Sequence, residues 1–212
     1  MIIREALMTK LPAIDESEAP GLVLQMQAVG LTDDQFECLC RENNDLVFEM
    51  TAQGELIIMS AGGVETSWRN AIIARELGNW AKRDGNGLAF DSSGIFILPS
   101  GAKRAPDASW LSKSRWRSIR SENRRPFAHI CPDFVVELRS PSDSVRYLSR
   151  KMEEYIRNGA GLGWLLDPIE NVASIFRPGA EAERIKSPAI LSGDPVLPGF
   201  KFDFTEILNP PE

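Results

Sequence analysis

The chain has 212 residues, with 24 Lys and Arg against 30 Asp and Glu, and 43% of its residues are hydrophobic. These values are typical of a soluble globular domain and exclude a disordered or fibrous chain. No stretch approaches the roughly 18 uninterrupted apolar residues of a membrane span, and the N-terminal residues do not resemble a secretory signal. We therefore expect no membrane partner.

Cysteine and histidine usage narrows the chemistry further. Cys38, Cys40 and Cys131 form neither a zinc spacing nor an even disulfide set, which indicates a reducing cytoplasm. His129 is the single histidine, so most histidine-based triads and metal sites are excluded. Chemistry in this chain must therefore depend on carboxylates, lysine or hydroxyl groups.

The first elements follow from local signals. Residues 1–30 show no sustained hydrophobic period and are predicted to form an N-terminal arm, followed by a single domain over residues 31–212. Thr32, followed by two acids, predicts the N-cap of a helix. Apolar runs at 46–50 and 55–59 flank a turn that contains Gly54, which predicts a β-hairpin. A helix over 65–83 should end near Gly85.

The rest of the chain mixes strands with one further long helix. Strands are predicted near residues 89–91, 95–98, 106–111 and 134–138, and a helix is predicted over 143–158. Further strands are expected at 163–167, 172–176 and around 200–204. This order predicts one α/β domain, in which helices flank a mixed sheet that contains the strands near 95, 108, 135 and 165.

Residues 101–125 carry eight basic residues and two acidic ones, although the whole chain is acidic. The segment also contains Trp110 and Trp116. Lysine and arginine neutralise phosphates and indole rings can stack on bases, so the segment could bind a polyanion. A solvated basic loop on an acidic protein explains the same pattern. The candidate phosphate contacts are Lys113, Arg115, Arg117, Arg120, Arg124 and Arg125.

Several acids occupy positions where burial is expected. A helical wheel places Glu76 near the centre of the apolar stripe of the helix at 65–83, with Arg69 in the same stripe. Glu137 interrupts the apolar strand at 134–138, and Asp107 follows Pro106 at the start of another strand. A buried carboxylate requires an ion pair, hydrogen bonds or a cation. Simple core pairing for Glu76 and turn chemistry for Asp107 are the alternatives.

The helix at 143–158 offers a cation for these acids. Lys151 lies on the flank of its apolar stripe, where its side chain could reach the end of the preceding strand or extend into solvent. Two carboxylates on adjacent strands can hold Mg²⁺, with water and phosphate oxygens in its remaining positions. A nearby lysine can stabilise negative charge that develops on phosphorus. Together these residues indicate metal-assisted phosphodiester chemistry.

The chain also resembles the Uma2 family of restriction-endonuclease-like proteins, within the PD-(D/E)xK nuclease pattern. The resemblance covers about residues 30–205 and rests on GGVETSWRN, FDSSGIFILPSGAKRAPDASWL, PDFVVELRSPSD, KMEEYIRNGAGLGWLLDP and VLPGFKFDF. It implies a central mixed sheet flanked by helices. It also implies that Asp107 and Glu137 bind Mg²⁺, for which Mn²⁺ can substitute, with Glu76 as the helical acid of the site.

The lysine of the pattern falls on Arg139, whose permanent charge and planar geometry make it a poor replacement. The resemblance places the lysine instead at Lys151, which leaves Arg139 and Arg69 as phosphate contacts. A site that cuts slowly or not at all is the competing interpretation.

Three functions stay open. They are a Mg²⁺-dependent DNA endonuclease, an inactive nucleic-acid-binding module on the same fold, and a phosphodiesterase acting on RNA. Cutting both strands of a duplex with one site per chain favours a homodimer.

Overall fold

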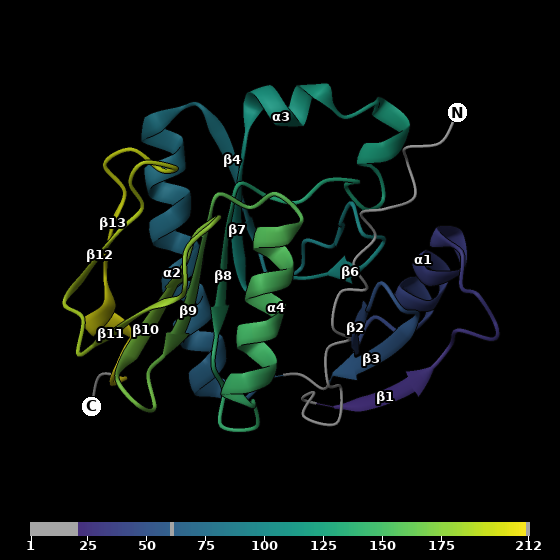
Figure 1. Cartoon of the computed structure of the whole chain (residues 1–212), viewed down its shortest axis with the longest axis horizontal. Coiled ribbons are helices and arrows are strands. Elements are labelled where there is room, and N and C mark those ends of the chain that lie inside the picture. The colour runs from purple at the N-terminus through teal and green to yellow at the C-terminus, as the bar shows by residue number, and fades with distance from the viewer. Residues whose placement is uncertain (1–20, 60–61, 211–212) are drawn as a thin grey trace.

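The computed structural model describes residues 21–59 and 62–210. Its main sheet has six strands in the order β11-β10-β9-β8-β7-β4 (Figure 1). Of its strand pairs, β8 with β9 is parallel and the others are antiparallel. The strands are β4 (Gly87–Asp91), β7 (Ala108–Ser112), β8 (Phe134–Leu138), β9 (Leu162–Asp167), β10 (Val172–Phe176) and β11 (Glu183–Lys186).

A second, five-stranded sheet lies beside the first and has the order β1-β3-β2-β6-β5 (Figure 1). Its strands are β1 (Leu22–Gln25), β2 (Val47–Met50), β3 (Glu55–Met59), β5 (Phe96–Ile97) and β6 (Lys103–Arg104). The predicted hairpin is confirmed as β2 and β3. Residues 22–25 of the predicted arm form the edge strand β1, whereas residues 1–20 lie outside the described part of the chain.

One strand lies in a different sheet from the one predicted. The strand near residue 95 was expected in the main sheet, and this was wrong, because β5 pairs with β6 in the second sheet. The reason is a tight local turn, in which Gly101 has a φ of 88° and the Leu98 N–H donates to the Ala102 carbonyl. That turn sends the chain straight back beside β5.

The predicted long helices are confirmed. Helix α1 (Asp33–Glu42) begins at Thr32 with a capping box, and α2 (Val64–Asp84) ends at Gly85 in the left-handed region. Helix α4 (Val145–Arg157) begins at Ser144, whose side chain accepts from the Tyr147 N–H. The sequence did not predict α3 (Lys113–Ser118) or the short helical turns η2 (Ser121–Arg124) and η3 (Phe204–Ile207).

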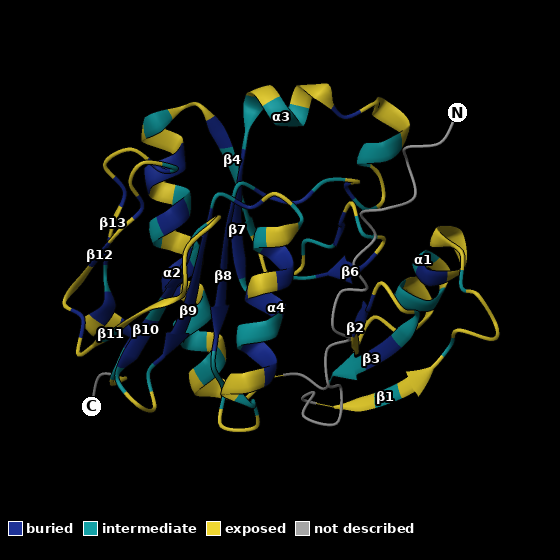
Figure 2. Cartoon of the chain, viewed as in Figure 1, coloured by how far each residue is buried: buried dark blue, intermediate teal, exposed yellow. Residues whose placement is uncertain are grey.

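The central strands β7, β8 and β9 of the six-stranded sheet are buried on both faces and are dark in Figure 2. On one face Trp110, Phe134 and Trp164 pack against α2 and the C-terminal segment with β12 (Ile190–Ser192) and β13 (Lys201–Asp203). On the other face Val135 and Leu165 pack against α4. The predicted α/β fold, a sheet between helices, is confirmed. Among the described residues, no helix has the length and apolar character needed to cross a membrane.

Candidate active site

Two acids meet at one end of β7 and β8. Ala108 is paired with Val136, so the antiparallel register continued by one residue places Asp107 opposite Glu137. Side chains directly opposite each other have Cβ atoms about 4.5–5.5 Å apart. One Asp107 oxygen, Oδ2, accepts from the Leu138 N–H at 2.7 Å, which ties Asp107 to the end of β8. Strand alternation turns both acids toward α4.

Lys151 lies on the face of α4 that covers Glu137. Its Nζ is 2.9 Å from Glu137 Oε1 and 3.0 Å from Oε2. Tyr155, one turn further along α4, donates its hydroxyl to Glu137 Oε1 at 3.0 Å. The Lys151 side chain therefore turns inward onto the acid and does not extend into solvent, the alternative that the sequence left open.

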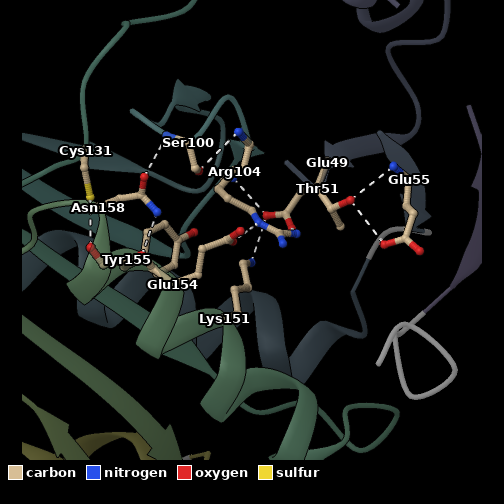
Figure 3. A network of polar contacts seen from close by, with 12 residues as sticks. Glu49, Thr51, Glu55, Ser100, Arg104, Cys131, Lys151, Glu154, Tyr155 and Asn158 are labelled. Atoms are coloured by element: carbon tan, nitrogen blue, oxygen red, sulfur yellow. Dashed lines mark hydrogen bonds and ion pairs between the residues drawn. The ribbon is translucent and has the colours of Figure 1, made fainter. Parts of the chain in front are cut away.

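A third acid, Glu49 on β2, belongs to the same cluster and was missed from the sequence. Its Oε1 lies 2.8 Å from Lys151 Nζ and accepts from the Ala105 N–H at 2.9 Å. Arg104 bridges Glu49 Oε2 at 3.0 Å and Glu154 Oε2 at 2.6 Å (Figure 3). Glu49 and Arg104 are both 0% exposed. An acid inside the apolar strand VFEM was the available signal, of the same kind that singled out Glu137.

The electrostatics of this buried cluster are unequal. Burial raises the pKa of Glu137 to about 8; Lys151 opposes this shift, whereas Asp107 and Glu49 add to it. Burial by itself would lower the pKa of Lys151, but Glu137 and Glu49 outweigh it and raise that pKa, so the ammonium stays charged. Burial also opposes ionisation of Glu49, yet Lys151 and Arg104 lower its pKa. Glu49 is therefore the more firmly ionised partner of Lys151.

The acids open into a cleft of about 680 Å³ between the two sheets. Asp107, Glu137 and Lys151 line it, together with Asn70 and Arg69 from α2. The loop between β8 and α4 forms another wall, contributing the range 140–143. This loop is polar, and its Ser140 N–H donates to Asp143 Oδ2 at 2.7 Å. The cleft is thus a polar cavity that two cationic side chains, Arg69 and Lys151, and four acids line: Glu65, Asp107, Glu137 and Asp143.

The helical acid expected in this site is elsewhere. Glu76 does not line the cleft; its Oε1 pairs with Arg75 Nε at 2.8 Å, and Arg75 also pairs with Glu206 on η3. The prediction that Glu76 joins the metal-binding acids was therefore wrong. The side of α2 that carries Arg69 and Glu76 faces η3, since Arg69 bonds to the Ile207 carbonyl. Asn70, about 120° from Glu76 around the helix, is on the side that faces Asp107.

The α2 residue that does reach the acids is Asn70. Its Nδ2 donates to Asp107 Oδ1 at 2.9 Å. Its Oδ1 is buried and has no hydrogen-bond partner among the residues that the structure describes. Asn70 therefore orients Asp107 and brings a further oxygen to the cleft.

The expected phosphate contacts mostly have partners within the chain. Arg69 lines the cleft, but its Nε donates to the Ile207 carbonyl at 2.7 Å. Arg139 does not line the cleft, because its guanidinium pairs with Asp167, its neighbour on β9, at 2.8 Å. The cross-strand pairing of these two residues displaces Arg139 from the role predicted for it.

The candidate phosphate contacts at 113–125 lie at the other end of β7, where α3 follows that strand (Figure 1). A strand of five residues spans about 17 Å, so α3 is separated from Asp107 by roughly that distance. Within the segment, Lys113 donates to the Gly85 carbonyl at 2.6 Å and Arg115 pairs with Asp133 at 2.7 Å. Arg124 lies over the Trp116 ring. Exposed members of the candidate contacts are Arg117, Arg120 and Arg125.

The donor set of the cleft suits a hard divalent cation. Among the described residues no group of three or more His, Cys, Asp or Glu is arranged to hold a metal. Of the acids that line the cleft, Asp107 and Glu137 lie opposite each other where β7 and β8 meet it, and they would be the two carboxylate ligands. Mg²⁺ is bound in this way, with water and phosphate oxygens as its other ligands. When all are ionised, the four acids that line the cleft exceed its two cationic side chains, Arg69 and Lys151, by two charges. A divalent cation would balance that excess.

This chain matches the model of one protein family, and its fold is similar to that of a solved structure. The model of a family described as "Uma2: Putative restriction endonuclease" matches residues 33–205. A crystal structure of "a putative nuclease belonging to DUF820" from Anabaena variabilis is similar, with a TM-score of 0.69 and 20% identity over 84% of this chain and 98% of that chain. No curated protein matches the chain.

Proposed function

This chain belongs to the Uma2 family, and from that premise we propose that it hydrolyses phosphodiester bonds of DNA with the help of Mg²⁺. The observation that carries the proposal is the Lys151 ammonium, 2.9 Å from Glu137 in a cleft that Asp107 also lines. Two acids and a lysine that converge in this way are what metal-assisted attack at phosphorus requires.

The acids have the first role in the proposal. Asp107 and Glu137 would hold Mg²⁺, and Asn70 would keep the Asp107 carboxylate in the orientation needed for this. A bound Mg²⁺ supplies a Lewis acid that polarises a phosphoryl oxygen and lowers the pKa of water. The Leu138 N–H and the Asn70 amide each donate to one Asp107 oxygen, so the carboxylate does not rotate freely.

Lys151 has the second role. Its charge is held beside the cleft, where a phosphate group gains negative charge as water attacks. A fixed charge in a site that excludes most water stabilises such a transition state more than a mobile one does. Arg139 is paired with Asp167 and is not proposed for this role.

The test is nicking of supercoiled plasmid in the presence of Mg²⁺ or Mn²⁺, with a chelator as the blank. Asp107→Asn, Glu137→Gln and Lys151→Met should each lower the rate by about 10²-fold or more. Glu76→Gln is the matched control, because it removes an acid that lies outside the cleft, and it should cut at the parent rate.

The other outcomes decide between the remaining functions. Metal-dependent cleavage of RNA but not DNA would replace the substrate with RNA. Binding of nucleic acid without cleavage of either would identify an inactive binding module. Linearisation of the plasmid in one binding event, with a twofold mass in light scattering, would support action as a homodimer.

A further inference from the structure

Lys151 is held by two carboxylates that come from different sheets. Glu137 lies on β8 of the main sheet, at 2.9 Å, and Glu49 lies on β2 of the second sheet, at 2.8 Å. Figure 3 shows the Lys151 side chain directed toward the Glu49 carboxylate. The two acids differ in their exposure to the cleft, because Glu137 lines it and Glu49 does not.

The Glu49 carboxylate is itself rigidly held. Arg104 binds its Oε2 at 3.0 Å, and the Ala105 N–H donates to its Oε1 at 2.9 Å. Arg104 also pairs with Glu154 on α4, at 2.6 Å. The side chains of Glu49, Arg104, Glu154 and Lys151 are nearly or fully buried, so water does not compete for these contacts. Glu49 therefore presents a fixed negative charge to Lys151 from outside the cleft.

A second acid is needed because Glu137 has competing roles. In the proposed function, Glu137 shares its charge with a divalent cation, which also repels the nearby ammonium group. With the cation bound, Glu137 alone would therefore hold the Lys151 ammonium only weakly during the reaction. Glu49 is separated from the cleft and keeps its charge for Lys151.

We propose that Glu49 is the positioning residue for Lys151, so that the N-terminal hairpin β2–β3 forms part of the catalytic apparatus. This inference rests on the proposed function for its catalytic consequence, but the positioning itself can be measured without cleavage. The competing explanation is structural, namely that Glu49 only neutralises the buried Arg104.

Glu154 separates the two explanations because it is a matched control. It pairs with the same Arg104 and is also buried, but the structure gives it no contact with Lys151 among the described residues. Glu49→Gln and Glu154→Gln each remove one negative charge from Arg104. Only Glu49→Gln removes a charge from Lys151.

The first readout is the ¹⁵N–¹H spectrum of the lysine ammonium groups, of which the chain has seven, with Lys151 assigned from its absence in Lys151→Met. The parent and Glu154→Gln should keep a slowly exchanging Lys151 signal, also after addition of Mg²⁺. Glu49→Gln should lose this signal when Mg²⁺ is added. A signal that persists in Glu49→Gln, or that disappears equally in both variants, overturns the inference.

The second readout is the rate of cleavage. Glu49→Gln should lower kcat about 10–100-fold, the usual effect of losing a residue that orients an active group, and leave KM nearly unchanged. Glu154→Gln should have a kcat close to the parent value. Equal losses of kcat in the two variants would assign Glu49 a structural role and overturn the inference.

A second variant and the separate cleavage assay keep the test decisive. If Glu49→Gln does not fold, Glu49→Asp retains the charge on Arg104 but draws the carboxylate away from Lys151, and it should show the same losses in smaller measure. If the parent protein cuts no nucleic acid with Mg²⁺ or Mn²⁺, the proposed function fails. The ammonium spectrum still decides whether Glu49 positions Lys151.

Discussion

Replacing Arg104 with methionine tests the buried charge cluster that supports the active site. Arg104 is 0% exposed and is bound to Glu49 at 3.0 Å and Glu154 at 2.6 Å. Methionine keeps much of the apolar length of the side chain but leaves both carboxylates without their shared cation. Removing one partner of a buried ion pair costs about 3–5 kcal/mol. We expect a loss of unfolding free energy in that range for Arg104→Met.

The assay is urea unfolding followed by circular dichroism, together with thermal unfolding. A loss of about 3–5 kcal/mol corresponds to a fall in Tm of roughly 6–20 °C for a chain of this size. Arg177→Met is the matched control, because Arg177 pairs with Glu183 at 3.4 Å with side chains that are 38% and 62% exposed. An exposed pair of this kind contributes about 0–1 kcal/mol.

The loss should also depend on pH. In the parent, Lys151 and Arg104 lower the pKa of Glu49 against the effect of burial, so this acid stabilises the fold above the ordinary glutamate pKa and loses that contribution as the pH falls. In Arg104→Met, Glu49 loses one of the two cations that lower its pKa, so its folded-state pKa rises. The unfolding free energy of this variant then decreases as the pH rises through that pKa, because Glu49 ionises without Arg104. The difference between the two proteins should therefore be smaller near pH 5 than near pH 8. A loss below about 1 kcal/mol at both pH values, like that of Arg177→Met, would refute the reasoning.

Three further predictions follow from single contacts. Asn70→Ala removes the donor that orients Asp107 and should weaken Mn²⁺ binding about 10–100-fold in calorimetry, and unchanged affinity would exclude Asn70 from the site. Gly87→Ala would bring a Cβ into overlap with the Trp110 ring and should cost about 1–3 kcal/mol in urea unfolding, whereas parent-like stability would show that the ring moves aside. Neutralising the three exposed arginines, Arg117, Arg120 and Arg125, should reduce the salt dependence of DNA binding. An unchanged salt slope would mean that DNA does not contact them.

The local elements of this fold could be predicted because their signals lie within a few residues. The capping box of α1 joins Thr32 to Gln35, three positions apart. The turn between β2 and β3 ends at Gly54, which has a φ of 86°. Such interactions depend on short stretches of chain, so the sequence alone determined where these elements begin and end.

The same reasoning identified Asp107, Glu137 and Lys151 as candidates, because a charged side chain in a buried element needs a partner. Their side chains do meet in the cleft, although their catalytic roles stay predictions. The strand pattern of β8 was sufficient to assign Glu137 to one face. It was not sufficient to say which residues cover that face.

Only the tertiary structure decided the partners. Glu49 and Arg104 are 55 residues apart, and Asn70 and Asp107 are 37 residues apart, so nothing local links them. Hydrophobic periodicity gives the inward side of a helix, but packing determines which element lies against each part of that side. For α2 this decided that Asn70 lies beside Asp107 and that Glu76 lies beside η3. A pattern with a period of a few residues carries no information about contacts that long-range packing creates.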